Sequence, residues 1–280
     1  MRNTVATLIL FALNLGCTRP NKIWPCRPGQ VPTAHPDMPT VQSGMSLYMH
    51  SHNDYEHATP LWTAIWNHFA SIEADITLEY GTFAVGHHSN YTDGKGRLEE
   101  LYLDPLQQRV NAYGSVYPDD PEFKTLYLVL DIKQANPDLP NALMKVLDNY
   151  PMLTVYTDDS VTPGPVTIIL TGEESMKRAV VESYSRRRAS RDSNVWSFDD
   201  PPADNRWTAY ALRWSDFFDW NGEGEMSADE QQAMLCLVDN TAATGRSLRL
   251  WDAPDHPSVW EIQSEDGVRF IGSDSLLKDQ

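Results

Sequence analysis

Positive charge is scarce in this 280-residue chain, which has 22 lysines and arginines against 39 aspartates and glutamates. A formal net charge of -17 argues against a protein that binds nucleic acid or an anionic membrane through its overall field. An anionic substrate would need cations placed locally to overcome that field. Hydrophobic residues make up 41% of the chain, which is ordinary for a globular protein with a well-filled core.

Histidine is scarce in the second half of the chain. Seven of the eight histidines lie at or before His88, and only His256 follows. A metal or proton-transfer site that takes histidines from late strands is therefore disfavoured. The chemistry of this chain is concentrated in its first half.

The N-terminal apolar run is too short to span a bilayer as a helix, because it covers only residues 5–15 and is interrupted by Asn14. With Arg2 before it and Gly16 and Cys17 after it, residues 1–17 have the form of an export signal. Residues 13–17 also resemble a bacterial lipoprotein cleavage box, from which Asn14 departs. We therefore expect an exported protein that is either secreted or held at the periplasmic or cell surface by a lipid on Cys17.

Only three cysteines occur, so processing at Cys17 would leave Cys26 and Cys236. In an oxidising compartment these two form either a disulfide or two unrelated thiols. Residues 18–45 are rich in proline and lack sustained periodicity, which predicts a linker. The folded domain is expected over residues 46–280.

Strand-like and helix-like segments alternate through this domain, which predicts an α/β fold with a parallel sheet and right-handed crossovers. The count approaches eight units, so we expect a closed (β/α)8 TIM barrel. The expected helices lie at residues 60–69, 98–113, 139–149, 173–184, 228–244 and 257–264. The expected strands lie at residues 47–51, 71–78, 82–85, 125–132, 153–157, 166–170, 194–198, 207–213, 247–251 and 268–271.

Three carboxylates fall where expected strands end. Glu73 and Asp75 are two residues apart, so their side chains share one side of a strand, and Asp131 ends the apolar strand before it. Two inward charges between Ile72 and Ile76 require compensation, which a cation would supply. Carboxylate oxygens suit Mg²⁺ or Ca²⁺, so we predict one divalent cation on these residues.

His52 and His87 also follow expected strands, beside the same carboxylates. Cleavage of a P–O bond needs one group that takes a proton and another that gives one, and imidazole titrates in the appropriate range. We therefore predict that these histidines form an acid/base pair. Lys133 either contacts the phosphate or orients a ligand through a salt bridge.

Together these motifs resemble the glycerophosphodiester phosphodiesterase superfamily of phospholipase C-like barrels, in the branch shared with spider-type phospholipase D (sphingomyelinase D). The resemblance covers about residues 46–276. It rests on His52-Asn53, Ile72-Glu73-Ala74-Asp75-Ile76, Val85-Gly86-His87, Leu130-Asp131-Ile132-Lys133, Leu248-Arg249-Leu250-Trp251 and Gly267-Val268-Arg269-Phe270-Ile271-Gly272-Ser273-Asp274.

The resemblance implies a TIM barrel with one metal on Glu73, Asp75 and Asp131, and with His52 and His87 as acid and base. It also implies that Lys133 and Trp251 face the substrate. Glycerophosphodiesterases usually carry His-Arg and His-Asp where this chain has His52-Asn53 and His87-His88. Asn53 is therefore a further substrate-binding candidate, and the difference concerns the substrate more than the chemistry.

We expect a monomeric, exported phosphodiesterase that acts on a small-molecule or lipid phosphodiester, by hydrolysis or by formation of a cyclic phosphate. A first alternative is a barrel hydrolase of the amidohydrolase or PHP type, with His50 and His52 as a metal pair. A second is a surface binding module without turnover. Residues 219–230 also fit an EF-hand-like calcium loop, although Ser227 and Glu230 equally form a helix-capping box.

Overall fold

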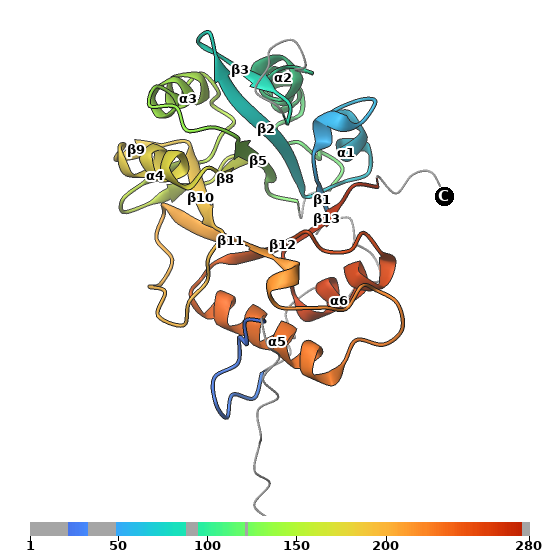
Figure 1. Cartoon of the computed structure of the whole chain (residues 1–280). Helices are drawn as coiled ribbons and strands as arrows, with labels where there is room; N and C mark the ends of the chain where they lie inside the picture. Colours follow the sequence, from blue (N-terminus) through green and yellow to red (C-terminus); the bar gives the residue numbers. More distant parts are fainter. Residues whose placement is uncertain (1–21, 33–48, 88–94, 121–122, 276–280) are drawn as a thin grey trace, which may run out of the picture.

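Eight parallel strands close into a barrel in the computed structural model, of which residues 22–32, 49–87, 95–120 and 123–275 are described here (Figure 1). The ring closes because the first strand pairs with both the second and the last. This confirms the predicted TIM barrel. In order around the ring the strands are β1 (Met49–Ser51), β2 (Ser71–Glu79), β5 (Leu126–Ile132), β8 (Val166–Gly172), β10 (Ala189–Ser193), β11 (Trp207–Arg213), β12 (Ser247–Trp251) and β13 (Phe270–Ser273).

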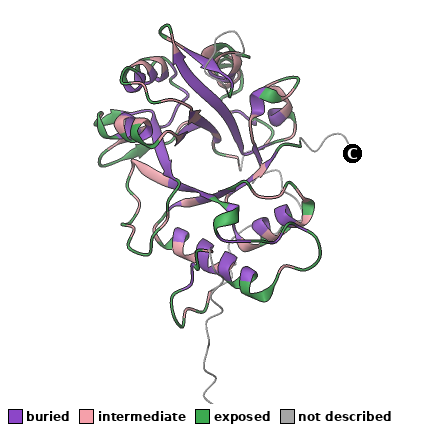
Figure 2. Ribbon diagram, viewed as in Figure 1, coloured by how far each residue is buried: buried purple, intermediate pink, exposed green. Residues whose placement is uncertain are grey.

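Helices lie outside the ring and turn their buried faces toward it (Figures 1 and 2). No helix occurs in the described loop 194–206, so the β10–β11 connection departs from the ideal barrel. An antiparallel extension of β2 is formed by β3 (Thr82–Val85) and β4 (Gly96–Arg97). The helices are α1 (Trp62–Trp66), α2 (Asp104–Tyr113), α3 (Leu139–Leu147), α4 (Glu174–Glu182), α5 (Ala228–Ala243) and α6 (Pro257–Asp266).

Local sequence sets the ends of these helices. Before α6, the His256 side chain accepts a hydrogen bond from the Ser258 amide, and Pro257 occupies the first helical position. The helix ends at Gly267, whose φ of 97° lies in the left-handed region that favours glycine. These signals direct the chain back toward β13, which closes the barrel.

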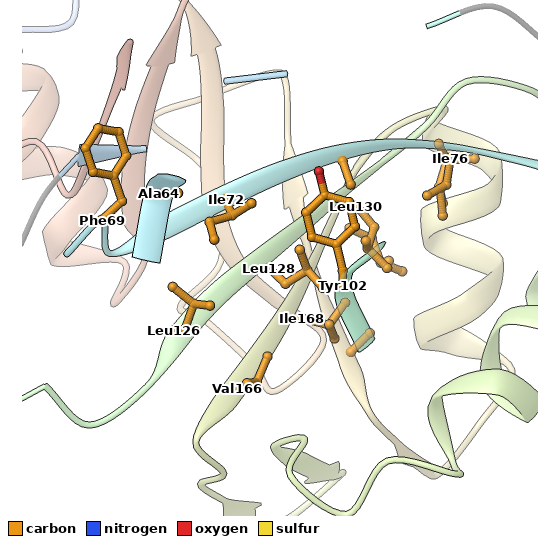
Figure 3. Close-up of a cluster of buried hydrophobic side chains, with 14 of the residues drawn as sticks. Ala64, Phe69, Ile72, Ile76, Tyr102, Leu126, Leu128, Leu130, Val166 and Ile168 are labelled. Atoms are coloured by element: carbon orange, nitrogen blue, oxygen red, sulfur yellow. The ribbon is translucent and has the colours of Figure 1, made fainter. Parts of the chain in front are cut away.

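Two apolar layers hold the barrel wall. Figure 3 shows the outer layer, where side chains of β2, β5 and β8 such as Ile72, Leu128 and Ile168 meet beneath the helices. Alternate residues face the barrel interior, where Val129, Ile169, Ala209 and Phe270 form a second cluster. Because successive residues point to opposite sides of a strand, Asp131 follows Val129 on the inner side.

Two predicted strands differ from the structure. The strand predicted at 194–198 is instead β10, which is polar and therefore lacked an apolar signal. Its Asp192 is buried because the fully buried Lys177 ammonium from α4 lies 2.8 Å from the carboxylate. The segment 153–157 contributes β6 (Val155–Thr157) to a small antiparallel sheet with β7 (Val161–Thr162) and β9 (Arg186–Arg187), outside the ring.

Part of the predicted linker is attached to the barrel. Cys26 and Cys236 form a disulfide that joins residues 22–32 to α5. Of the two alternatives for these cysteines, the structure therefore has the disulfide and not two unrelated thiols. Lys22 makes a 2.6 Å ion pair with Asp219, and the Asn240 side chain donates to the Pro25 carbonyl. Figure 1 shows this blue segment beside α5.

The predicted signal and Cys17 lie in residues 1–21, outside the described part of the chain, so they stay predictions. Residues 33–48, which include the rest of the predicted linker, lie outside it as well. Among the described residues, no helix combines the length and apolar character needed to cross a membrane.

Replacing Cys236 by serine is expected to lower the free energy of unfolding by about 2–5 kcal/mol, because the disulfide closes a very long loop in the unfolded chain. Urea unfolding with and without reductant measures the effect. Reductant should bring the wild type to the midpoint of the variant and leave the variant unchanged. Equal midpoints for the oxidised wild type and the variant would show that the bond does not stabilise the fold.

Candidate active site

Polar side chains gather at the carboxyl ends of the barrel strands. In the parallel register of β2 and β5, Asp75 lies opposite Asp131, and Glu73 lies one inward position earlier. Ile72 and Ile76, on the other side of β2, belong to the outer core. The alternation of the strand therefore places both β2 carboxylates inside the barrel.

These three carboxylates form one cluster, because Glu73, Asp75 and Asp131 each offer an oxygen within 4.8 Å of the others. Glu73 and Asp75 are buried, and Asp131 is partly buried. Three negative charges at this spacing are costly in a protein interior unless cations compensate them. The predicted acidic site is thus assembled by the fold, and it could hold a metal ion of unspecified identity.

One oxygen of Glu73 is bound by a buried arginine and a buried histidine. Oε2 accepts from Arg249 Nη1 at 2.9 Å and lies 2.9 Å from His50 Nε2. Burial lowers the pKa of His50 to about 4, so the ring is neutral near pH 7. Burial alone would raise the pKa of Glu73, but Arg249 and the His50 hydrogen bond hold it well below its ordinary range. Glu73 is therefore ionised.

One oxygen of Asp75 is surrounded by donors. Oδ2 accepts from the Tyr55 hydroxyl at 2.8 Å, from Lys133 Nζ at 2.9 Å and from His87 Nδ1 at 3.0 Å. The other oxygen, Oδ1, is buried and has no hydrogen-bond partner among the described residues. An unpartnered carboxylate oxygen in a buried acidic cluster is suited to a cation.

Lys133 also binds Asp131, with Nζ 2.9 Å from Oδ2. Burial and the nearby Glu73 raise the pKa of Asp131, while the lysine opposes the shift. Burial would lower the pKa of Lys133, but Asp131 and Asp75 outweigh it, so the pKa is raised and the ammonium stays charged.

Gly172 makes room for Asp131. A Cβ at residue 172 would collide with Asp131 Oδ1 and with the Ile132 backbone, and the φ of 84° also favours glycine. In Asp131, then, Lys133 binds Oδ2, and the missing Cβ at Gly172 leaves space for Oδ1. An all-oxygen set with a spare buried oxygen fits a hard divalent cation.

The two predicted catalytic histidines both have Nδ1 next to an aspartate. His52 Nδ1 lies 2.6 Å from Asp274 Oδ1, and His87 Nδ1 lies 3.0 Å from Asp75 Oδ2. Their side chains are 42% and 58% exposed, so both rings are open to a ligand. The hydrogen bond with Asp274 raises the pKa of His52. In both rings Nε2 is the nitrogen on the side opposite the aspartate.

The two other predicted substrate residues lie at different places. Trp251 is 38% exposed at the end of β12 and lines a pocket together with His52 and Asp274. Its ring nitrogen donates to the Ala211 carbonyl at 3.2 Å. Asn53 has left-handed backbone geometry, with a φ of 47°, and its amide oxygen lies 3.2 Å from the Tyr55 hydroxyl. Asn53 therefore contacts Tyr55, which in turn donates to Asp75 of the cluster.

The sequence prediction assigned no role to three residues that the structure brings to the site, Tyr55, Arg249 and Asp274, and it gave His50 a role only as a metal ligand in the first alternative. A charged residue between Leu248 and Leu250 was an available signal, since a buried strand rarely carries an unpaired arginine. Asp274 lies in the closing segment that supports the resemblance, but its contact with His52 depends on the pairing of β13 with β1.

Two alternative metal sites find no support among the described residues. His50 Nε2 lies 2.9 Å from an Arg249 guanidinium nitrogen, a position unsuited to a metal pair with His52. In the EF-hand-like segment, Glu230 accepts from the Asp219 amide and from the Ser227 hydroxyl. Ser227 caps α5, because its hydroxyl accepts from the Glu230 amide, as the helix-capping interpretation of that segment predicted.

Comparisons with known proteins identify the domain family of this chain. Residues 40–190 match the AIM6-like phosphodiesterase domain. The chain is 25% identical over 263 residues to altered inheritance of mitochondria protein 6 homolog of Arthroderma benhamiae, which covers 81% of each chain.

Two yeast relatives share this similarity. Altered inheritance of mitochondria protein 6 is 27% identical in Lachancea thermotolerans and in Saccharomyces cerevisiae. The matches cover 81% and 82% of this chain, but 63% and 68% of those proteins. No solved structure matches the chain. Because the matched domain spans more than half of the sequence and contains the carboxylate cluster, the chain belongs to the AIM6-like phosphodiesterase domain family.

Proposed function

We propose that this protein is a metal-dependent phosphoric diester hydrolase or cyclising lyase that cleaves glycerophosphodiesters or phospholipid and lysophospholipid headgroups. The observation that carries the proposal is the pair of histidines at one barrel mouth, each with Nδ1 next to an aspartate, around a buried carboxylate cluster. The glycerophosphodiesterase and spider-type phospholipase D resemblance supports the substrate class.

The charge of the cluster fits a phosphodiester. Three carboxylates face two cations, Arg249 and Lys133, while His50 is neutral. The protein groups alone leave one net negative charge, and a divalent cation turns this into one positive charge. A phosphodiester carries one negative charge, so its binding would neutralise the site.

We propose one ion, Mg²⁺ or Ca²⁺, on Glu73, Asp75 and Asp131. The opposite oxygens of Glu73 and Asp75 are already bound by arginine, lysine, histidine or tyrosine donors, which leaves no second set of carboxylate oxygens. Binding of this ion supplies Lewis-acid stabilisation of charge on the phosphoryl oxygens.

The proton transfers are assigned to Nε2 of His52 and of His87, because Nδ1 of each ring faces an aspartate. One ring takes the proton from the attacking oxygen, and the other gives a proton to the leaving alkoxide. With water as nucleophile the products are a phosphomonoester and an alcohol. With a substrate hydroxyl they are a cyclic phosphate and an alcohol.

The remaining substrate contacts follow from exposure. Lys133 is 21% exposed beside the cluster and is proposed to contact the phosphate, while its ammonium also orients two carboxylates. Trp251 is proposed to line the headgroup pocket beside His52. Asn53 is proposed to bind the substrate at the edge of the site, because its amide oxygen already contacts the Tyr55 hydroxyl.

Product release from a panel of glycerophosphodiesters and lysophospholipids tests the proposal, with ³¹P NMR to separate phosphomonoester from cyclic phosphate. We expect turnover with Mg²⁺ or Ca²⁺ that EDTA abolishes and that added metal restores. A folded protein that releases no product from any member of the panel would favour the binding-module alternative. Turnover that survives EDTA would contradict the metal requirement.

The Asp274→Asn variant tests whether His52 is the base or the acid in the pH profile of kcat/KM. Because the hydrogen bond with Asp274 raises the pKa of His52, its loss should lower that pKa and move one limb of the kcat/KM profile to lower pH. Movement of the acidic limb identifies His52 as the base, and movement of the alkaline limb identifies it as the acid. If neither limb moves, His52 does not transfer a proton in the rate-limiting step.

We further propose that the protein is exported and acts as a monomer. The export signal and a lipid tether on Cys17 rest on sequence alone. The Cys26–Cys236 disulfide supports an oxidising compartment.

A further inference from the structure

We infer that Tyr55 is a positioning residue for the metal, because its hydroxyl determines which oxygen of Asp75 is presented to the ion. The inference rests on the proposed function, in which Asp75 is a ligand. Tyr55 follows the β1 strand in the short 3-10 helix Asp54–Glu56, and nothing in the proposed acid/base chemistry requires it.

The hydroxyl has one proton and two acceptors within reach. Asp75 Oδ2 lies at 2.8 Å and the Asn53 amide oxygen at 3.2 Å. An ionised carboxylate is the stronger acceptor, and it is also the nearer one. The proton is therefore donated to Asp75 Oδ2, which leaves Oδ1 as the oxygen without a partner.

Tyr55 differs from the other two donors to this oxygen. Lys133 is 21% exposed and also binds Asp131, and His87 is 58% exposed, so both are open to substrate. The Tyr55 side chain is 1% exposed and belongs to the core. It cannot turn toward a ligand, so its hydrogen bond holds the carboxylate in one orientation throughout the reaction.

The loop that carries Tyr55 is itself fixed. Asp54 is fully buried and accepts hydrogen bonds from the Ser51 hydroxyl, the Leu61 amide and the Tyr102 hydroxyl. The first helical turn after β1 is thereby held against the barrel. Because outer partners orient metal-ligating carboxylates, loss of the Tyr55 hydroxyl should weaken metal binding.

Titration of the full-chain protein with Mn²⁺, followed by electron paramagnetic resonance, tests this inference. Tyr55→Phe removes the hydroxyl and keeps the ring, and we expect its Kd for Mn²⁺ to rise about 10–100-fold above that of the wild type. Tyr117→Phe is the matched control, since Tyr117 is also buried and its hydroxyl also donates a hydrogen bond, but to the Phe69 carbonyl and not to a proposed ligand or to Asp54. Its Kd should stay within twofold.

Melting temperatures without metal separate the two effects, because each variant loses one buried hydrogen bond. A purely structural role for Tyr55 would lower the melting temperature and leave the Kd unchanged, which would overturn the inference. If Tyr55→Phe does not fold, Tyr55→Met repeats the test without a donor. A wild type that binds no Mn²⁺ would overturn the proposed metal site as well, whereas equal Kd values overturn the role of Tyr55 alone.

Discussion

Replacing Asp75 by asparagine is expected to lower phosphodiester turnover by about 10³-fold or more. The two carboxylate oxygens have different tasks, because Oδ2 accepts from Tyr55, Lys133 and His87 while Oδ1 is without a partner. An asparagine NH₂ would face either these three donors or the ion. Neither orientation preserves the site. A loss of about 4 kcal/mol of charge stabilisation in the transition state corresponds to the expected 10³-fold loss of turnover.

Initial rates at saturating metal, together with circular dichroism, measure this effect. Asp192→Asn is the matched control, because Asp192 is also a buried aspartate paired with a lysine but lies outside the carboxylate cluster. It should lose less than tenfold. A folded Asp75→Asn protein with turnover within tenfold of the wild type would exclude Asp75 as a metal ligand.

His52→Ala and His87→Ala are each expected to reduce turnover by about 10²–10⁴-fold, the usual contribution of a positioned acid or base. The aspartate beside each Nδ1 directs the transferred proton to Nε2, and alanine removes that nitrogen. Steady-state rates with an alkyl phosphodiester and with a p-nitrophenyl phosphodiester measure the two roles. A p-nitrophenolate leaving group needs no proton, so the variant that lacks the acid should recover most of its rate with this ester.

His68→Asn provides the control for the histidine variants. His68 stacks on Tyr117 away from the cluster, and its φ of 57° is one that asparagine tolerates. Its turnover should match that of the wild type. If His52→Ala or His87→Ala retains the wild-type rate on the alkyl ester, the histidine concerned has no part in proton transfer.

Much of the barrel could be predicted because its strands carry strong local signals. In β5 the apolar residues before Asp131 predicted both a buried strand and its end, and β2 and β12 were as clear. The strand β10 was misplaced because Arg191 and Asp192 give it a polar sequence. Its stability depends on the ammonium of Lys177, and a contact between residues fifteen positions apart leaves no periodic signal.

The site was predictable in part for a geometric reason. Parallel strands place their carboxyl ends at one end of a barrel, so residues such as Glu73, Asp131 and His87 were expected to converge once the barrel was inferred. Which partners these residues contact was not predictable from the sequence. Arg249 and Asp274 reach the site through strands near the other end of the sequence, and only ring closure brings them beside β1.

The measurement that tests the central claim most directly is anomalous diffraction from crystals grown with Mn²⁺ or Ca²⁺. We predict one strong peak per chain, about 2.0–2.6 Å from an oxygen of each of Glu73, Asp75 and Asp131, with the peak absent in Asp75→Asn. A peak at another position would contradict the assignment of the catalytic ion to this cluster. So would the absence of any peak in crystals of a protein whose turnover requires the metal.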